Sequence, residues 1–378
     1  MKNCYFDYNS TTPVNLEVQG IILDLIQNNY GNPSNIHSEG RDARERLEIS
    51  RQEVAELIGA DKNEIYFTSS GSEANNLALK GLRPLYESGK NHIITSITEH
   101  SSIYETAKHL NKRGIELTLL SVDSDGKIDL NQLKQSIKKN TALISIMTAN
   151  NETGVLQNMD AIANIAGEKG IILHSDAVQA MGKIPVNVNN PQFDMLTLSS
   201  HKIYGPKGVG ALYIRKGLSI ESQIHGGGQE KKIRSGTENI PLIGGFGEAC
   251  RIIGVNFDKD VKHMSQMKNM LYRGIAENIK CLKLNGSLDV TLPNTLNISF
   301  PGFESETLIL DLDSAGFSVS AGAACSEMKS GSSRILKAMK LKPAELFSSL
   351  RFSIGRETKE KDVLRLVETL TKIVRNLN

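Results

Sequence analysis

The chain has 378 residues, a formal net charge of +2 and a hydrophobic fraction of 39%, values typical of a globular protein with a large apolar core. This near-neutral charge argues against binding to nucleic acid or membrane surfaces, and no apolar run is long enough to span a bilayer. The N-terminus lacks the apolar stretch of a signal peptide and the four scattered cysteines fit neither a disulfide scaffold nor a zinc site, so we expect a cytoplasmic protein.

The predicted elements begin with an extended segment and two helices. Residues 5–13 are expected to be extended and to lead into a helix that starts near Val14, and a turn separates this helix from a second one over 41–58. From residue 64 onward, short apolar runs alternate with helical patterns such as 77–86. We expect strands at 65–68, 92–97, 115–120, 143–148, 171–174, 193–198 and 209–214. This alternation predicts an α/β fold with a mostly parallel sheet that has helices on both faces.

The C-terminal third of the chain is expected to form a second domain. After residue 241 a helical pattern runs to about 279, and its apolar periodicity is broken near 255–260, which indicates the change of domain. The elements expected beyond it are strands at 294–300, 317–320 and 350–355 and helices at 304–316 and about 358–377.

The cysteines differ in their predicted surroundings. The run of small and polar residues at 321–333 cannot pack firmly, so it predicts a mobile loop in which Cys325 is exposed. We expect Cys4, Cys250 and Cys281 to be buried packing residues, because free cysteines usually are. Cys325 is therefore the cysteine for which the sequence predicts reactivity.

Polar residues follow five of the predicted strands at their carboxyl ends, where open α/β sheets bind their ligands. Taken singly, each is explained as well by a helix cap or by an exposed loop. In chain order they are Ser70, Gly71, Ser72 and Glu73, then Glu99 and His100, then Asn150, Asn151 and Glu152, then Asp176 and Gln179, and finally Ser199, His201 and Lys202. Together they bring hydroxyls, a histidine, amides, a carboxylate and a lysine to one edge of the sheet.

This combination of side chains suits a pyridine aldehyde phosphate. A lysine forms an imine with the aldehyde, and a carboxylate pairs with the protonated ring nitrogen so that the ring can accept electrons. A histidine can lie over the ring and move protons, amides can hydrogen-bond the phenolic oxygen, and hydroxyls at a helix N-terminus can hold the phosphate. Pyridoxal phosphate is therefore one candidate cofactor. NAD is the rival, but no G-x-G-x-x-G follows the first strand of the series.

Two later segments also carry candidate ligand-binding residues. Three consecutive glycines at 226–228 let the backbone approach a ligand closely, and Arg234 and Thr237 could contact a phosphate or carboxylate. The alternative for this segment is a flexible surface loop. Arg351 could bind a substrate carboxylate through two hydrogen bonds, and its alternative is a surface salt bridge.

These motifs, in this order, resemble the NifS/IscS-like cysteine desulfurases, a family within class V of the pyridoxal phosphate-dependent aminotransferase superfamily. The matching stretches extend over nearly the whole chain, at 7–13, 31–34 with His37, 67–79, 99–100, 150–154, 174–179, 182–183, 199–213, 226–230, 234–239, 320–325 and 351–355. The resemblance implies a homodimer of fold type I, with a seven-stranded, mostly parallel sheet in a large cofactor-binding domain at 14–256. It implies a smaller α/β domain formed by 1–13 and 257–378, which carries the Cys325 loop at about 321–333.

The resemblance also implies a role for each site residue. By motif position, Lys202 would form the Schiff base, Asp176 would pair with the ring nitrogen, and His100 would stack on the ring and relay protons. Arg351 would bind the substrate carboxylate and Cys325 would accept the sulfur. The remaining contacts would be Gly71, Ser72, Ser199 and His201 to the phosphate, Asn151 and Gln179 to the phenolic oxygen, Asn151 also to the substrate, and Thr237 to the phosphate bound in the neighbouring subunit. No metal site is implied.

The implied reaction removes sulfur from L-cysteine, giving L-alanine and a persulfide on Cys325. A sulfur-acceptor protein would then receive the sulfur for iron–sulfur cluster assembly or tRNA thiolation, with no direct contact to nucleic acid or membrane. One alternative is a selenocysteine lyase or another class V enzyme that uses pyridoxal phosphate. A second alternative is a sulfur carrier or scaffold protein without catalysis, against which Lys202, Asp176 and His100 argue together.

Some positions depart from the family pattern. Ser72 stands where threonine is usual, although it keeps the hydroxyl, and Ala321 and Ala323 stand where the family usually has serines. Residues 328–332 lack the Leu-Glu-Pro that often follows the cysteine. The loop keeps the long form, which points to the NifS/IscS group, but these differences leave the identity of the sulfur acceptor open.

Overall fold

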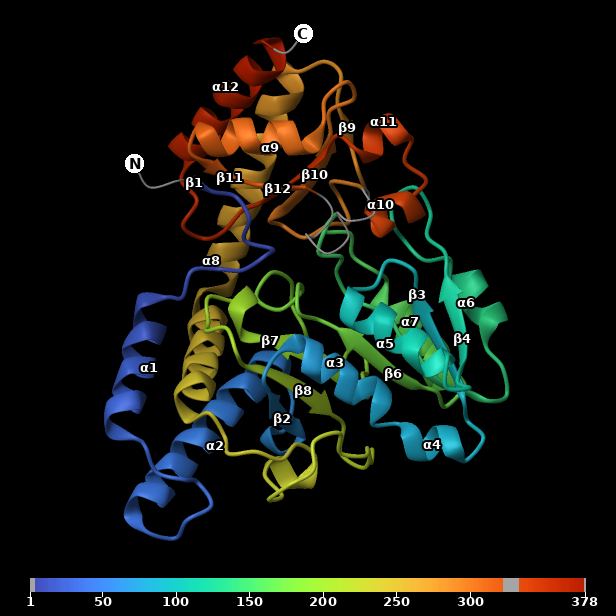
Figure 1. The fold of residues 1–378 in the computed structure, drawn as a ribbon, viewed down its shortest axis with the longest axis vertical. Coiled ribbons are helices and arrows are strands. Elements are labelled where there is room, and N and C mark those ends of the chain that lie inside the picture. Colours follow the sequence, from blue (N-terminus) through green and yellow to red (C-terminus); the bar gives the residue numbers. More distant parts are fainter. Residues whose placement is uncertain (1–3, 322–332, 377–378) are drawn as a thin grey trace.

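The computed structural model describes residues 4–321 and 333–376, and Figure 1 shows the arrangement of their elements. A seven-stranded sheet lies in the lower half of this view, and elements from both ends of the chain lie together in the upper half. The strands of the sheet, in spatial order, are β2 (Ile65–Thr68), β8 (Gly210–Ile214), β7 (Met195–Ser199), β6 (Ile172–Asp176), β5 (Thr141–Ser145), β3 (His92–Ser96) and β4 (Glu116–Leu120). Only β8 is antiparallel to its neighbours. The predicted seven-stranded, mostly parallel sheet is therefore confirmed.

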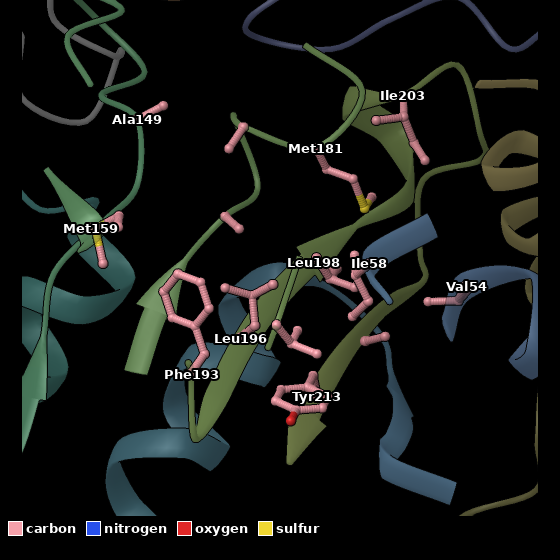
Figure 2. Close-up of a cluster of buried hydrophobic side chains, with 14 of the residues drawn as sticks. Val54, Ile58, Ala149, Met159, Met181, Phe193, Leu196, Leu198, Ile203 and Tyr213 are labelled. Carbon is pink, nitrogen blue, oxygen red and sulfur yellow. The ribbon is translucent and has the colours of Figure 1, made fainter. Parts of the chain in front are cut away.

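The strands are continuous apolar runs because helices cover both faces of the sheet. Met195 of β7 packs in a hydrophobic cluster on one face, whereas Leu196 and Leu198 pack in the main cluster on the other. Figure 2 shows part of this main cluster, in which Val54 and Ile58 lie near the strand residues. The two covered faces leave the strand ends as the part of the sheet that a ligand can reach.

Twelve α-helices surround the strands in the described part of the chain. They are α1 (Leu16–Asn28), α2 (Ser38–Ile58), α3 (Gly71–Lys80), α4 (Arg83–Glu87), α5 (Ser101–Asn111), α6 (Leu130–Ser136), α7 (Met159–Glu168), α8 (Ile240–Asn278), α9 (Ser305–Ser314), α10 (Arg334–Ala338), α11 (Pro343–Leu346) and α12 (Glu360–Asn376). The single helix predicted at 77–86 is in fact two, because Pro84 cannot donate a main-chain hydrogen bond and α4 begins anew around it. None of the helices that the structure describes is both long and apolar enough to cross a membrane.

A second hydrophobic cluster lies in the upper half of Figure 1. Its sheet consists of β12 (Ser320–Ala321), β13 (Ser349–Ser353), β10 (Thr295–Ser299) and β9 (Lys283–Leu284), and beside it β1 (Cys4–Tyr5) pairs with β11 (Phe317–Ser318). The strand predicted at 317–320 is thus divided between two sheets. Phe6 packs in this second cluster, whereas Ile335 and Leu336 of α10 pack in the main one. Leu366 and Leu370 of α12 pack in the second cluster with Phe6, so segments from both ends of the chain contribute to the same core.

Helix α8 connects the two clusters without interruption over 39 residues. Phe246 and Ile253 pack in the main cluster, and Met264 and Leu271 pack in the second one. Between them Val255 is 76% exposed. The broken periodicity near 255–260 thus marks a change of packing partner and not the end of a helix, since the main-chain hydrogen bonds of a helix are local.

The prediction that Cys4, Cys250 and Cys281 are buried is only partly confirmed. Cys250 is buried in α8 and Cys4 is half-buried, but Cys281 is exposed. Cys281 lies between the end of α8 and β9, in a short connection that leaves its side chain exposed. Cys325 lies outside the described residues.

A buried ion pair joins α2 to the glycine-rich loop. Arg51 donates to both carboxylate oxygens of Glu230, at 2.7 and 2.8 Å, and Glu230 also accepts from the main-chain nitrogen of Phe67 at 2.8 Å. Arg51 is 4% exposed and Glu230 is 6% exposed. Removing one member of such a pair leaves the other charge buried without its partner.

We expect Arg51→Met to destabilise the protein by about 3–5 kcal/mol, because it leaves the Glu230 carboxylate uncompensated in the core. Urea unfolding followed by circular dichroism measures the change. The matched control is Lys372→Met, which removes an ion pair to Glu368 on the solvent-exposed side of α12 and should leave the midpoint unchanged. Equal midpoints for the two variants would contradict the structural role of the Arg51–Glu230 pair.

Candidate active site

A cavity of about 550 Å³ lies at the carboxyl ends of the parallel strands and is closed on the other side by the N-terminal segment and β13. Of the residues predicted for the site, those that line it are Gly71, Ser72, His100, Asn151, Asp176, Gln179, Ser199, His201, Lys202 and Arg351. Thr237 is exposed and is not part of this lining. Cys325 lies outside the described residues. Side chains carried by the strand ends of the seven-stranded sheet and by β13 of the smaller sheet thus meet at one cavity.

Lys202 is held where its amine can react. It ends a short turn of 3-10 helix, Ser200–Lys202, directly after β7, and its Nζ donates to the main-chain oxygens of Asn9 and Ser10, both at 2.6 Å. Burial and, to a smaller extent, the charge of Arg351 lower the pKa of Lys202 from its ordinary 10.5 to about 8. The nearby carboxylates of Asp7 and Asp176 partly offset both effects. A lysine with this pKa is partly neutral near pH 8, as a nucleophilic amine must be.

Asp176, the last residue of β6, is buried and firmly oriented. Its Oδ1 accepts from the main-chain nitrogen of Val178 at 3.0 Å, and its Oδ2 accepts from Nδ2 of Asn75 at 2.7 Å. The carboxylate is 5% exposed and lines the cavity. It is therefore placed to pair with a cationic nitrogen of a bound ligand.

His100 lies at the exposed end of the cavity and caps α5. The main-chain nitrogen of Ser102 donates to His100 Nδ1 at 3.2 Å, and Ser102 Oγ lies 2.8 Å from the same nitrogen. Two contacts on one ring nitrogen fix the orientation of the imidazole.

Two side-chain amides at neighbouring strand ends differ in whether their polar atoms have hydrogen-bond partners. Gln179 donates from Nε2 to the main-chain oxygen of Asn9 at 2.9 Å, and its Oε1 accepts from buried Lys183 at 3.0 Å. Asn151 has a buried Oδ1 without a hydrogen-bond partner among the residues that the structure describes. Because buried polar atoms are normally paired, the Asn151 amide indicates a ligand in the cavity.

Arg351 reaches the cavity from β13 and is not the surface salt bridge that the sequence left possible. Its Nη2 donates to Asp7 Oδ1 and to Ser10 Oγ, both at 2.7 Å, and its Nη1 donates to the main-chain oxygen of Asn151 at 3.0 Å. The guanidinium is buried, and its Nε has no partner in the described part of the chain. A donor is thus available for an anionic group in the cavity.

The N-terminus of α3 forms the corner of the cavity between β2 and β7. Ser70 caps the helix by accepting from the main-chain nitrogen of Glu73 at 3.1 Å, and the first-turn amides of Gly71 and Ser72 have no partner within the helix. A Cβ added to Gly71 would lie 3.0 Å from a methyl group of Val178, so glycine allows this close approach. Free amides at the positive end of a helix bind anions such as phosphate.

His201 completes this corner in its neutral form. Burial and, to a smaller extent, the charge of Lys202 lower the pKa of His201 to about 4. The Nδ1 of His201 lies 3.2 Å from Thr11 Oγ1. A neutral ring can donate one hydrogen bond to an anion without adding a charge to the site.

Sequence reasoning did not single out several residues that line this cavity. Asp7, Asn9 and Ser10 come from the N-terminal segment, where the match to the family at 7–13 was a signal but no role was assigned to these residues. Asn75 was also missed. A polar residue among the apolar residues of the buried face of α3, such as Ala74 and Leu77, was a signal that could have identified it. Ser102, in the first turn of α5, had no such signal.

Comparisons with known proteins agree with this geometry. Residues 4–366 match the family model described as aminotransferase class-V. The chain is 42% identical to a protein named cysteine desulfurase IscS from Dictyoglomus turgidum, over 100% of this chain and 95% of that protein. A solved NifS-like protein has a TM-score of 0.93 at 34% identity and covers 99% of this chain and 100% of its own. A structure described as SspA in complex with cysteine has a TM-score of 0.82 at 34% identity, over 94% and 99% of the two chains.

The similarity extends over the whole fold, including the strand ends and the N-terminal segment that enclose the cavity. The resemblance found in the sequence is therefore confirmed at the level of the family and its activity. The chain belongs to the class-V aminotransferase family and, within it, to the cysteine desulfurases of the IscS/NifS type, which depend on pyridoxal phosphate.

Proposed function

We propose that this cavity binds pyridoxal phosphate and L-cysteine and that the sulfur leaves on Cys325. The observation that carries the proposal is a half-buried lysine of lowered pKa, Lys202, in one cavity with the buried carboxylate of Asp176 and the guanidinium of Arg351. These three groups come from different elements, and a packing role would not require them to share a cavity. The relative described as bound to cysteine supports the choice of substrate.

The cavity fits the cofactor on its own geometry. The buried Oδ1 of Asn151 lacks a partner among the described residues, and the first turn of α3 offers free amides beside Gly71, where an added Cβ would crowd a methyl group of Val178 at 3.0 Å. When bound, pyridoxal phosphate supplies an aldehyde that forms imines with amines and a ring that accepts electrons. Lys202 would hold it covalently and Asp176 would pair with its ring nitrogen. The amides of Asn151 and Gln179 would contact its phenolic oxygen.

The remaining groups of the cavity bind anions and move protons. Gly71, Ser72, Ser199 and His201 surround the corner proposed for the phosphate. Arg351 would bind the substrate carboxylate, with Asp7 and Ser10 holding the guanidinium in place. His100 would lie against the cofactor ring and carry protons between substrate atoms.

The sulfur-transfer step balances as a displacement. The thiolate of Cys325 attacks the sulfur of the bound cysteine, so that a sulfur–sulfur bond forms and the carbon–sulfur bond breaks. The electron pair of the broken bond stays with the amino-acid carbon, which takes up a proton and leaves as L-alanine. The product on the enzyme is a persulfide, which a second protein can receive.

We further propose a homodimer in which Thr237 contacts the phosphate bound by the partner subunit. Thr237 is exposed and does not line the cavity of its own chain, as this arrangement requires.

We place the boundary between the two domains near residue 256, within α8, because the apolar side chains of this helix pack in the main cluster before that residue and in the second cluster after it. Iron–sulfur assembly or tRNA thiolation would use the sulfur, in a reducing compartment such as the cytoplasm that keeps Cys325 a thiol.

The direct test is to measure L-alanine and sulfide formed from L-cysteine in the presence of a thiol reductant and pyridoxal phosphate. We expect both products in equal amounts. L-selenocysteine, offered in parallel, tests the related lyase activity. A protein that binds the cofactor and forms no alanine from L-cysteine would refute the proposal.

The lowered pKa of Lys202 predicts a pH dependence of cofactor attachment. The neutral amine is the reactive form, so the rate at which cofactor-free protein binds pyridoxal phosphate should rise with pH to a plateau, with a midpoint near 8 and not near 10.5. Arg351→Met removes a charge that lowers this pKa, so its midpoint should move to higher pH. Arg215→Met, which alters an ion pair with Asp194 outside the cavity, is the control. Stopped-flow absorbance measures the rates, and identical midpoints for all three proteins would contradict the prediction.

A further inference from the structure

A chain of hydrogen bonds connects His100 with Asp176 through two residues, Asn75 and Ser102. Nδ2 of Asn75 lies 2.7 Å from Asp176 Oδ2 and 2.8 Å from Ser102 Oγ, and Ser102 Oγ lies 2.8 Å from His100 Nδ1. Asn75 is 1% exposed, and α3 packs against α5 around it. The two ends of this chain of bonds are the residues proposed to lie at the ring nitrogen and over the ring of the cofactor.

The direction of each hydrogen bond follows from the chemistry of the groups. A carboxylate only accepts, so the Asn75 amide must present its NH₂ group to Asp176, and its second hydrogen then goes to Ser102 Oγ. The opposite orientation of the amide would place Asn75 Oδ1 against a carboxylate oxygen. The orientation of Asn75 is therefore determined by Asp176.

The orientation of Asn75 determines in turn the state of His100. Because Ser102 Oγ accepts from Asn75, its own hydrogen is available to His100 Nδ1. The main-chain nitrogen of Ser102, which can only donate, also points at Nδ1, at 3.2 Å. With two donors directed at it, Nδ1 carries no hydrogen, and the proton of the neutral ring is on Nε2.

We propose that Asn75 is a positioning residue that, through Ser102, keeps His100 in the tautomer protonated at Nε2 while it orients the carboxylate of Asp176. One buried amide thus orients both Asp176 and His100, which are proposed to contact the cofactor at two different places. The N–H of the His100 ring is then at Nε2, and Nδ1 is the nitrogen that Ser102 contacts. The proposal rests on the proposed function for its consequence in catalysis. The tautomer itself is a property of the protein alone.

The experiment is long-range ¹H–¹⁵N NMR of the full-length protein labelled with ¹⁵N-histidine, which distinguishes a protonated from an unprotonated ring nitrogen. His100→Gln identifies the His100 signals among the eight histidines of the chain. We expect the wild-type ring to be protonated at Nε2 only. Asn75→Asp places a carboxyl oxygen beside Asp176, where the two carboxyl groups share one proton, and the same oxygen accepts from Ser102, so that the serine hydroxyl turns away from His100. In this variant, the fraction of rings protonated at Nδ1 should rise from near zero to about half, with the Ser102 main-chain nitrogen limiting the change.

Two further variants separate this role from simple packing. Asn76→Ala removes the neighbouring asparagine, which also joins α3 to α5 by accepting from Thr106 at 3.0 Å but touches neither His100 nor Asp176, and it should keep the wild-type tautomer. Ser102→Thr keeps the hydroxyl and should also keep the wild-type tautomer of His100. A wild-type ring protonated at Nδ1, or Asn75→Asp spectra identical to wild type, would overturn the proposal.

The measurement is made on the cofactor-free protein and repeated after addition of pyridoxal phosphate. Failure to bind the cofactor would count against the proposed function and would leave the tautomer readable. In the loaded enzyme we expect Asn75→Asp to lower kcat for L-cysteine by about tenfold or more, with Asn76→Ala unchanged, since proton transfer by a positioned side chain contributes at least that much. A changed tautomer with unchanged kcat would overturn the catalytic part of the proposal.

Discussion

Lys202→Ala abolishes the formation of L-alanine from L-cysteine and removes the visible absorbance of lysine-bound cofactor. We expect a loss of activity of about 10³-fold or more, because covalent attachment and amine exchange both need this side chain. The structure gives the reason, since Lys202 lines the cavity together with Asp176 and Arg351, and the charges of both act on its amine. Absorbance spectra and an alanine assay on the purified variant measure the two effects.

The matched control for this variant is Lys207→Ala. Lys207 lies five residues further along the same loop, is exposed and does not line the cavity. It should keep both the absorbance and the activity. A Lys202→Ala protein that still attaches the cofactor covalently, or that turns over L-cysteine at the wild-type rate, would show that another residue is the anchor.

Cys325→Ser separates the sulfur acceptor from the cofactor site. We expect this variant to retain the absorbance of bound pyridoxal phosphate and to lose the persulfide, because a hydroxyl at ordinary pH is a far weaker nucleophile than a thiolate. Mass spectrometry after incubation with L-cysteine should find one added sulfur on Cys325 in the wild-type protein and none in the variant. Alanine formation should fall by about 10²-fold or more, since turnover depends on removal of the sulfur.

Cys281→Ser provides the comparison for this test. Cys281 is an exposed cysteine that does not line the cavity, so it reports on general thiol reactivity. We expect its replacement to leave both the persulfide and the turnover unchanged. Undiminished turnover in Cys325→Ser, or added sulfur found mainly on Cys281, would refute the assigned nucleophile.

The positions of the strand-end residues could be predicted because the rule that connects them is local. An apolar run of four to six residues indicates a buried strand, and parallel strands bring their carboxyl ends to the same edge. His100, Asp176 and Lys202 each follow such a run directly. Their meeting in one cavity then required only that the strands belong to one sheet, which the structure confirms.

Contacts between distant segments could not be predicted in this way. Arg351 bonds to Asp7 across 344 positions of sequence, and the match to the family at 7–13 did not show which residue Asp7 would contact. The two halves of α8 pack in different cores, and the sequence indicated this only as a break in apolar periodicity. In both cases the deciding interaction involves a partner that lies elsewhere in the chain.

Lys202 illustrates both sides of this difference. The sequence by itself determined that a lysine follows a buried strand and that four other strands deliver complementary groups to the same edge, because strand periodicity and parallel order depend on neighbouring residues. Only the tertiary structure decided the chemistry of that lysine. Its burial, the charge of Arg351 and the carbonyl oxygens of Asn9 and Ser10 come from segments that folding brings together, and it is these contacts that set its pKa and orientation.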